Sequence, residues 1–570
     1  MTAASSTTEV DTTLEKDMKN IKDNVTTPKE QETSSLAKDV EDVKEQGETP
    51  TEQEYPPLAK VIVIILALYL AVFLVALDQT IIGVAIPKIT DQFKSISDIA
   101  WYGSAYFLTS TALQPSYGRI YKIFSVKWAF LAAVFIFEIG SLICAVAPSS
   151  TVLIVGRAVA GIGVAGIFSG ALVIISMTVP LPKRPLVFGM FGMIWGLASI
   201  AGPLLGGVFT DSISWRWCFY INLPIGGVSI AVILFILRLP GTNEYAGKPI
   251  LERLRQLDLI GASLLMPAVV CLLLALQWGG NKYAWNNSRI IGLFVGFGLL
   301  AILFAISQVY IGEKATLPPN ILRQRSVLAS CMFALFFGGA FFLLVYYVPI
   351  FFQSVEGSSA MKSGIQLLPM MLATVVSSVV IGGLITAVGY YTPFLIISAA
   401  IAAIGTGLIT LYDIDISAGK WIGYQIVVGA GVGAGFQVPM TAVQTVLKPA
   451  DIPVGTAAVM FFQTLGGALF IAVGQAVFQN GLISGVVKYA PSVGPEVIVG
   501  AGATEMRHVL TQLGQLDQLD GVIKAYMSGL RDAYRVSLAI AVVAFVASLF
   551  LEWKSVKAGG NKDEVAVPAL

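Results

Sequence analysis

The sequence predicts an all-α polytopic membrane protein, and two observations support this fold class. Of the 570 residues, 56% are hydrophobic and only 12% are charged, whereas soluble globular chains carry about 25% charged residues. Such a chain has too little polar surface to cover a water-facing globule of this size, so the surplus apolar surface requires lipid. The second observation is a succession of apolar runs from Lys60 onward, each close to the roughly 20 residues that a helix needs to cross a bilayer.

These runs predict 14 transmembrane helices. In chain order they cover residues 61–86, 101–118, 127–147, 151–178, 187–210, 217–238, 258–278, 289–311, 327–350, 364–387, 393–412, 421–446, 454–479 and 534–553. Between the last two runs, the more polar stretch 480–533 is expected to be an outer loop, with an amphipathic surface helix or irregular chain at 505–526.

Composition divides the chain into five parts. The first 60 residues hold 14 Asp and Glu against 7 Lys and few large apolar side chains, which is typical of disorder. We therefore expect a disordered acidic cytoplasmic tail at 1–59. The other expected parts are a six-helix bundle at 60–238, a linker with two extra transmembrane helices at 239–326, a second six-helix bundle at 327–555 that includes the outer loop, and a cytoplasmic tail at 556–570.

Two glycine-dense runs indicate an internal repeat. The fourth run begins GRAVAGIGVAG at Gly156 and the twelfth begins GAGVGAGFQVP at Gly429; each is followed by a short basic turn with proline. Their offset of eight runs fits two six-helix halves separated by two helices. Repeated halves are typical of transporters that rock around a central site, although glycine-rich membrane helices also pack closely for purely structural reasons.

The positions of Lys and Arg predict the orientation in the membrane. If the N-terminus is cytoplasmic, inner loops carry about 13 of these residues and outer loops 7, as expected from the enrichment of basic residues in cytoplasmic loops. Both termini are therefore expected in the cytoplasm. The sequon that starts at Asn286 then falls in an outer loop, where glycosylation is possible.

Three charged residues lie well within the predicted helices: Asp78, Glu138 and Arg157. Charges inside a membrane are costly and often functional. A carboxylate in a low dielectric can bind and release a proton near neutral pH, and a buried arginine needs an anionic or dipolar partner. Asp78 and Arg157 are thus candidates for a proton-coupled switch, with a structural ion pair as the alternative. For Glu138 the structural interpretation is favoured.

The fifth run contains a glycine-proline block. Gly202 and Pro203 are followed by Gly206 and Gly207, with Gly189 further upstream. Proline frees a backbone carbonyl and glycine allows close approach of another helix. The block is expected to form a hinge or, alternatively, a tight and immobile packing seam.

These motifs resemble the major facilitator superfamily, and within it the 14-helix drug:proton antiporters of fungal type. The glycine-proline block is similar to the antiporter motif, with Ala198 in place of a usual glycine, and the stretch from Leu153 through Arg157 is similar to a motif assigned to proton coupling, with Ala160 in place of a usual glutamine. The resemblance covers about residues 60–555. It implies export coupled to inward proton movement.

The loop after the second run also resembles a family motif, one assigned to gating. It keeps Gly118, Arg119, Lys122 and Lys127 but lacks the aspartate of that motif. Without this aspartate, the loop has no acidic residue of its own for a charge relay.

A cavity for varied substrates is expected to combine aromatic and amide side chains with few fixed charges. The candidates, each of which has a packing role as its alternative, are Tyr106, Gln114, Trp195, Tyr347, Gln353, Gln437, Gln444 and Gln463. They suit hydrophobic or amphipathic toxins, secondary metabolites or drugs.

Other functions fit the sequence less well. A vacuolar transporter of basic amino acids or siderophores is the alternative within the same superfamily. With one histidine, His508, and no nucleotide-binding loop, metal cluster or catalytic triad, we expect no enzyme, no bound metal, no cofactor beyond the proton gradient and no nucleic-acid partner. We expect a functional monomer in the cell membrane, with the vacuolar membrane as the alternative.

Overall fold

The structure, a computed structural model, describes residues 56–95, 98–239, 247–280 and 283–557. Within these ranges it is helical, and its only β-pairing is two isolated bridges. Twelve of the described helices are long and apolar enough to cross a membrane, which confirms the prediction of an all-α, multi-pass protein. The expected acidic tail lies outside the described residues as far as Tyr55, and the C-terminal tail from residue 558.

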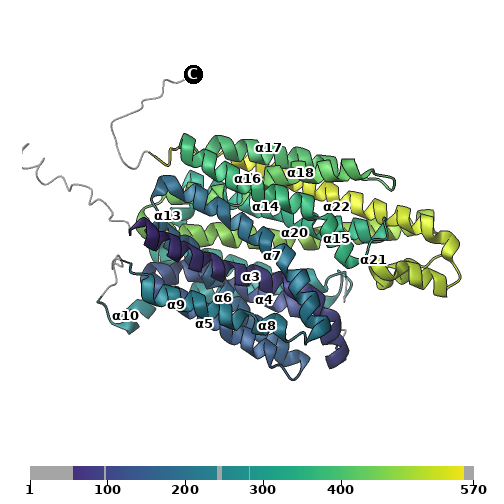
Figure 1. Ribbon diagram of the computed structural model, residues 1–570, viewed down its shortest axis with the longest axis horizontal. Coiled ribbons are helices and arrows are strands. Elements are labelled where there is room, and N and C mark those ends of the chain that lie inside the picture. Colours follow the sequence, from purple (N-terminus) through teal and green to yellow (C-terminus); the bar gives the residue numbers. More distant parts are fainter. Residues whose placement is uncertain (1–55, 96–97, 240–246, 281–282, 558–570) are drawn as a thin grey trace, which may run out of the picture. The chain divides into compact units, whose positions relative to one another are not determined.

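The helices fall into a first group, a linker and a second group (Figure 1). The first group comprises α3 (Leu58–Phe93), α4 (Ile99–Ile123), α5 (Val126–Ala145), α6 (Ser150–Thr178), η2 (Leu181–Lys183), α7 (Arg184–Ser212), α8 (Trp217–Tyr220) and α9 (Asn222–Ile236). The linker comprises α10 (Ile250–Leu254), α11 (Leu259–Trp278), α12 (Ser288–Ile311), η3 (Gly312–Lys314) and α13 (Pro319–Leu322). The second group comprises α14 (Arg325–Ser354), α15 (Ala360–Gln366), α16 (Leu368–Val388), α17 (Thr392–Ile409), α18 (Ala418–Gly435), α19 (Val438–Val446), η4 (Pro449–Asp451), α20 (Ile452–Tyr489), α21 (Pro495–Gln512), η5 (Leu516–Gln518) and α22 (Leu519–Ser548).

Local chemistry explains where several helices begin and end. The Ser149 hydroxyl accepts a hydrogen bond from the Val152 amide at the start of α6, and the Asp258 carboxylate accepts one from the Gly261 amide at the start of α11, as N-caps do. At the end of α16, Gly389 adopts φ 94°, a left-handed conformation that suits glycine.

The helices of both groups run between two ends of the helical body. We call the end where α3 begins and α22 finishes the terminal end; it lies on the left in Figure 1. The opposite end, where α8 and α21 lie, is the distal end.

The two groups repeat one packing pattern. In the first group, α3 packs on α7 and α9, α4 on α6, and α5 on α6 and α9. In the second group, α14 packs on α20 and α22, α16 on α18, and α17 on α18 and α22. The groups meet along two seams, α4 with α20 and α7 with α16. In the repeated pattern α4 corresponds to α16 and α7 to α20, so the two seams are equivalent. The glycine-dense helices α6 and α18 therefore occupy matching places, as the repeat in the sequence predicts.

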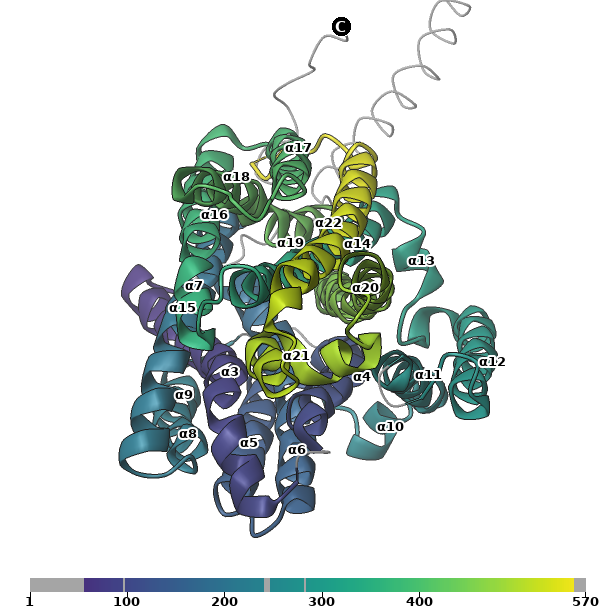
Figure 2. The same cartoon turned by 90° about the vertical axis from the view of Figure 1, so that its right-hand side faces the viewer.

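The linker helices α11 and α12 lie beside this pair of bundles. Figure 2 shows them next to α4 and α20, with α12 outermost. Only 6% of the apolar window of α12 is buried within the protein. A helix with apolar side chains on all sides and so little burial is suited to lipid contact.

Two of the 14 expected spans, α4 and α22, are less apolar than the twelve membrane-type helices. Both are nevertheless packed between those helices, α4 against α6 and α20, and α22 against α14, α17 and α20. Burial against protein removes the need for an apolar side chain at every position. The described residues thus contain twelve membrane-type helices, and the expected count of 14 holds only approximately.

The stretch 480–533, expected to be an outer loop with a surface helix or irregular chain at 505–526, is mostly helical. α20 continues to Tyr489, α21 follows, and α22 begins at Leu519. A Cβ on Gly485 would lie 2.7 Å from the Ala525 Cα, so α20 and α22 touch almost backbone to backbone. With 38 residues, α20 is about 57 Å long, longer than a bilayer core of about 30 Å. The polar side chains that suggested a loop belong to helices that project beyond the membrane.

Candidate functional site

Asp78 and Arg157 form an ion pair in the interior of the first group. Asp78 Oδ2 lies 2.5 Å from Arg157 Nη1, and both side chains are 1% exposed. Asp78 comes from α3 and Arg157 from α6, two helices that pack together. The structure therefore brings together the two residues that the sequence singled out for proton coupling.

Arg157 has further partners on α4. Its Nε donates to the Tyr102 carbonyl oxygen at 2.8 Å, and its guanidinium lies 4.2 Å from the centre of the Tyr106 ring. A buried guanidinium is stabilised by such acceptors and by an aromatic face. Tyr106 was expected in a substrate cavity, but it supports the charge pair instead.

Asn222, at the start of α9, contacts the other side of Asp78. Its Nδ2 lies 3.4 Å from Asp78 Oδ1 and 3.1 Å from the Ser141 hydroxyl on α5. Neither Asn222 nor Ser141 was predicted for this site from the sequence. A completely buried amide within an otherwise apolar helix is the signal that identifies Asn222.

The glycine-proline block lies at close contacts of α7. A Cβ on Gly202 would overlap the Thr80 hydroxyl on α3 and lie 2.7 Å from the Thr80 Cβ, and one on Gly206 would lie 3.0 Å from Ile81. A Cβ on Gly207, by contrast, would meet nothing within 4 Å. α7 stays helical through Pro203. In this conformation the block is a packing seam between α3 and α7.

Gly189 belongs to a different interface. A Cβ there would lie 2.5 Å from the Ser378 carbonyl oxygen on α16, and the Ser378 hydroxyl donates to the Gly189 carbonyl oxygen at 2.9 Å. Gly189 thus lies in the seam between the two groups. A further close contact joins Gly382 of α16 to the Pro185 carbonyl oxygen.

The four residues of the expected gating loop lie at the terminal end and have different partners. Gly118 packs on α20, where its Cβ would lie 2.8 Å from Ala457. Arg119 is buried and donates to carbonyl oxygens of the linker, those of Glu313 and Gln256. Lys127 donates to the last carbonyl oxygens of α9.

Lys122 joins the two groups. Its Nζ lies 2.6 Å from Asp451 Oδ1, in the turn before α20, and the two side chains are 19% and 23% exposed. A carboxylate from the second group therefore stands beside the loop that has no aspartate of its own. Arg184 makes a similar link, donating to Gln444 Oε1 at 3.4 Å.

Reversing the charge of either Lys122 or Asp451 is expected to weaken the terminal-end contact by about 1 kcal/mol. The double variant Lys122→Glu with Asp451→Lys restores an attractive pair, so it is expected to regain most of the lost thermal stability and transport rate. A double-mutant cycle on purified protein in detergent and in vesicles measures this. Additive losses in the double variant would show that the two side chains do not interact.

The remaining side chains expected in the substrate cavity are dispersed. Gln114 accepts from the Thr464 hydroxyl across the α4–α20 seam, Trp195 stacks on Phe168 at 6.3 Å between ring centres, and Gln353 donates to Ser363. Gln437 lies at the break between α18 and α19, and Gln463 is half-buried on α20. None of these five residues lines the cavity in the second group described next, so their grouping in one cavity stays a prediction.

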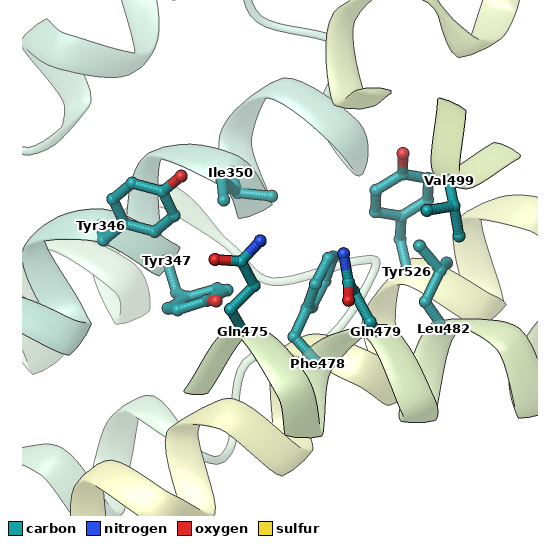
Figure 3. A pocket seen from close by; sticks show the side chains of 9 residues that line it. All are labelled: Tyr346, Tyr347, Ile350, Gln475, Phe478, Gln479, Leu482, Val499 and Tyr526. Carbon is teal, nitrogen blue, oxygen red and sulfur yellow. The ribbon is translucent and has the colours of Figure 1, made fainter. Parts of the chain in front are cut away.

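A cavity of about 170 Å³ lies in the second group toward the distal end (Figure 3). Of the expected residues, only Tyr347 lines it. The complete lining consists of Tyr346, Tyr347, Ile350, Gln475, Phe478, Gln479, Leu482, Val499 and Tyr526. Figure 3 shows the rings and amides of α14, α20 and α22 around one space. The Tyr347 hydroxyl is buried and has no hydrogen-bond partner among the described residues.

Three residues of this lining, Leu482, Val499 and Tyr526, lie beyond the predicted end of the thirteenth span at 479, in the stretch expected to be a loop. Gln475, Phe478 and Gln479 lie inside that span but were not predicted to line a cavity. Phe478 and Leu482 are separated by four residues, as are Gln475 and Gln479, so each pair lies on one helical face. Phe478 packs between Tyr347, at 5.5 Å, and Tyr526, at 6.0 Å. That spacing, continued past 479, is the signal for the longer helix.

Comparisons with known proteins agree with this architecture. The family model of the Major Facilitator Superfamily matches residues 68–471. The MFS-type efflux pump MFS1 of Arthroderma benhamiae is 52% identical over 507 residues, which cover 89% of this chain and 94% of that protein. The efflux pump aflT of Aspergillus parasiticus is 49% identical over 499 residues, which cover 87% of this chain and 96% of that protein.

Two solved structures share the fold. The proton:xylose symporter XylE matches with a TM-score of 0.58 at 13% identity, over 88% of this chain and 97% of that one. The human organic anion transporter MFSD10 matches with a TM-score of 0.56 at 12% identity, over 86% of this chain and 100% of that one. At these identities the likeness concerns the fold alone.

Proposed function

Because this chain belongs to the Major Facilitator Superfamily, we propose that it exports hydrophobic or amphipathic small molecules in exchange for protons. Relatives named as efflux pumps match nearly the whole chain, which favours export over the alternative of vacuolar amino acid or siderophore transport. The observation that carries the proton part is the buried pair of Asp78 and Arg157. Fully desolvated charges in a membrane are retained where they serve transport.

Proton exchange follows from the chemistry of the pair. While Asp78 is ionised, it holds Arg157 and ties α3 to α6. A proton that binds to the Asp78 carboxylate removes the negative charge, whereas Arg157 keeps its positive charge. The pair then loses its Coulomb attraction and the two helices can shift. Release of the same proton on the opposite side of the membrane restores the ion pair.

The two groups are expected to move against each other at the seams between them. Lys122 with Asp451 and Arg184 with Gln444 join the groups at the terminal end, and the apolar core of the first group continues there into α19 and α20. We infer that this conformation is closed at the terminal end. Rocking of one group against the other would break these contacts and open the cytoplasmic side.

The cavity of Figure 3 is our candidate for part of the substrate path. None of its lining side chains is charged, and its rings and amides offer stacking and hydrogen bonding, which suits a neutral or weakly charged aromatic toxin, secondary metabolite or drug. About 170 Å³ is below the roughly 300–1,000 Å³ of drug-sized sites. In this conformation it would hold one ring system rather than a whole molecule.

Orientation and location follow from the charge distribution. The terminal-end loops carry the excess of Lys and Arg, which favours a cytoplasmic terminal end in the cell membrane, or alternatively the vacuolar membrane. Asn286 is exposed before α12 at the distal end, where glycosylation would then be accessible. We propose that a monomer is the functional unit, since each chain contains both groups.

Purified protein in sealed vesicles provides the direct test. With an imposed pH gradient, we expect movement of at least one compound from a panel of neutral aromatic amphipaths, accompanied by proton flux in the opposite direction. The readouts are compound fluorescence and a pH-sensitive dye in the vesicle lumen. Transport that ignores the gradient would contradict proton exchange, and no movement of any compound would contradict export.

A further inference from the structure

Glu138 of α5 is a buried carboxyl that the ion pair does not use. Its side chain is 7% exposed and faces α9, where a Cβ on Gly226 would overlap Glu138 Oε1 and lie 2.5 Å from its carboxyl carbon. Only glycine leaves room for the carboxyl at this point. The seam between α5 and α9 is therefore shaped around Glu138, whereas the sequence favoured a merely structural role for this residue.

Neither carboxyl oxygen of Glu138 has a hydrogen-bond partner among the described residues. Asp258, also buried, shows the opposite environment. Its oxygens accept from the Gly261 amide, the Gln308 side chain, and both the amide and the hydroxyl of Thr316. A buried carboxylate needs such donors or a cation, and without them the neutral acid is the stable form. Asp258 thus has the donors that a carboxylate needs, and Glu138 has none among the described residues.

The neighbouring ionisable groups do not supply a cation for Glu138. The ionisable group that acts on Glu138 is the Asp78 carboxylate on α3. Arg157 on α6, Cys144 on α5 and Cys218 on α8 act in turn on Asp78, and Arg216, just before α8, donates to the carbonyl oxygens of Ala145 and Ala147 beyond the end of the seam. α9 contributes no ionisable side chain. Arg157 is already paired with Asp78, so an ionised Glu138 would add a second negative charge beside that pair.

Asn222 lies in the same α5–α9 seam as Glu138 and contacts the ion pair. Ser141 lies one turn from Glu138 on α5, and Asn222 lies one turn from Gly226 on α9. The amide nitrogen of Asn222 contacts both Ser141 and Asp78, while its Oδ1 is buried without a donor. A protonated Glu138 is a donor, and the oxygen of Asn222 is an acceptor within the same seam.

From this geometry we propose that Glu138 is a second proton-binding site of the transport cycle. This proposal rests on the proton exchange proposed above and adds a carrier to it. When the α5–α9 seam admits water, the O–H bond of Glu138 breaks, its electrons remain on the carboxylate, and the proton passes to water or to the Asp78 carboxylate. A proton from the other side of the membrane later restores the acid.

Infrared spectroscopy of the full-length protein in lipid vesicles tests this without any substrate, since the proton itself is the probe. We expect a C=O band of a protonated carboxyl that fades from mildly acidic to mildly alkaline buffer. Glu138→Gln, which keeps the shape of the neutral acid, is expected to lose this band. Glu138→Asp is expected to shift it, which assigns the band independently should one variant fold poorly. Asp258→Asn is the matched control and is expected to leave the band unchanged.

Two results would overturn the proposal. If the Glu138→Gln spectrum equals that of the wild type, no exchangeable acid exists at this position. If the band persists through the whole pH range, Glu138 is a permanently neutral packing group. Both outcomes are independent of the vesicle transport assay. A negative infrared result would therefore not contradict proton-driven export, and a negative transport result would not prevent assignment of the infrared band to Glu138.

Discussion

Replacing Arg157 by alanine is expected to abolish proton-driven export while the protein still reaches the membrane in near wild-type amounts. Without Arg157, the Asp78 carboxylate loses the cation with which it is paired. It can therefore no longer alternate between paired and protonated forms. Gradient-driven export is therefore expected to fall to background in vesicles that hold equal amounts of folded protein. Matching these amounts separates the loss of coupling from the roughly 3–5 kcal/mol of stability that removing one partner of a buried pair costs.

Asp78→Asn is expected to allow substrate movement but to abolish its coupling to protons. The amide oxygen can still accept a hydrogen bond from Arg157, but the side chain can no longer take up a proton. Downhill movement of a substrate is therefore expected to persist, whereas accumulation driven by a pH gradient is lost. Paired assays in vesicles, with and without the gradient, distinguish these two activities.

An exposed ion pair provides the control for both variants. Arg531 and Asp413 lie 3.2 Å apart with side chains 41% and 67% exposed, and such pairs contribute little. Asp413→Asn should therefore leave transport and coupling unchanged. Full gradient-driven accumulation by both Arg157→Ala and Asp78→Asn would remove the buried pair from the mechanism.

Most of the fold was predictable because the length of an apolar run indicates whether a helix can cross the membrane. The apolar runs gave the helices, and the glycine-dense runs at Gly156 and Gly429 gave the repeat now visible as equivalent packing of α6 and α18. The exception, the stretch 480–533, has the polar composition of a loop. The close contact between Gly485 and Ala525 joins residues 40 positions apart, and the length of an apolar run does not predict such a contact.

The site was predictable in part for a similar reason. A charge in an apolar run is conspicuous, so Asp78 and Arg157 could be identified singly and their pairing expected. Amide and aromatic side chains are common in membrane helices, and the sequence does not say which of them share a space. Gln114 and Gln444 proved to join the two groups, and only Tyr347 reached the cavity. A structural role was predicted for Glu138 because its lack of hydrogen-bond partners cannot be seen in the sequence.

The glycines of α7 offer the second prediction with a large effect, because two neighbours differ sharply in their surroundings. A Cβ on Gly202 would overlap the Thr80 hydroxyl, which donates to the Ala198 carbonyl oxygen at 3.0 Å and so ties α3 to α7. Gly202→Ala must push the helices apart, at a cost of about 1–3 kcal/mol. A Cβ on Gly207 meets nothing within 4 Å, so Gly207→Ala is expected to be neutral or to stabilise by up to about 1 kcal/mol.

Thermal unfolding in detergent and transport in vesicles, measured on both variants, decide what the glycine-proline block does. If the block is a packing seam between α3 and α7, Gly202→Ala lowers both the melting temperature and the transport rate, and Gly207→Ala lowers neither. If the block is chiefly a hinge, both alanines stiffen α7, and transport falls in both while the melting temperature holds or rises. Equal melting temperatures for the two variants would therefore refute the seam, because the overlap at Gly202 cannot be relieved without moving α3 away from α7.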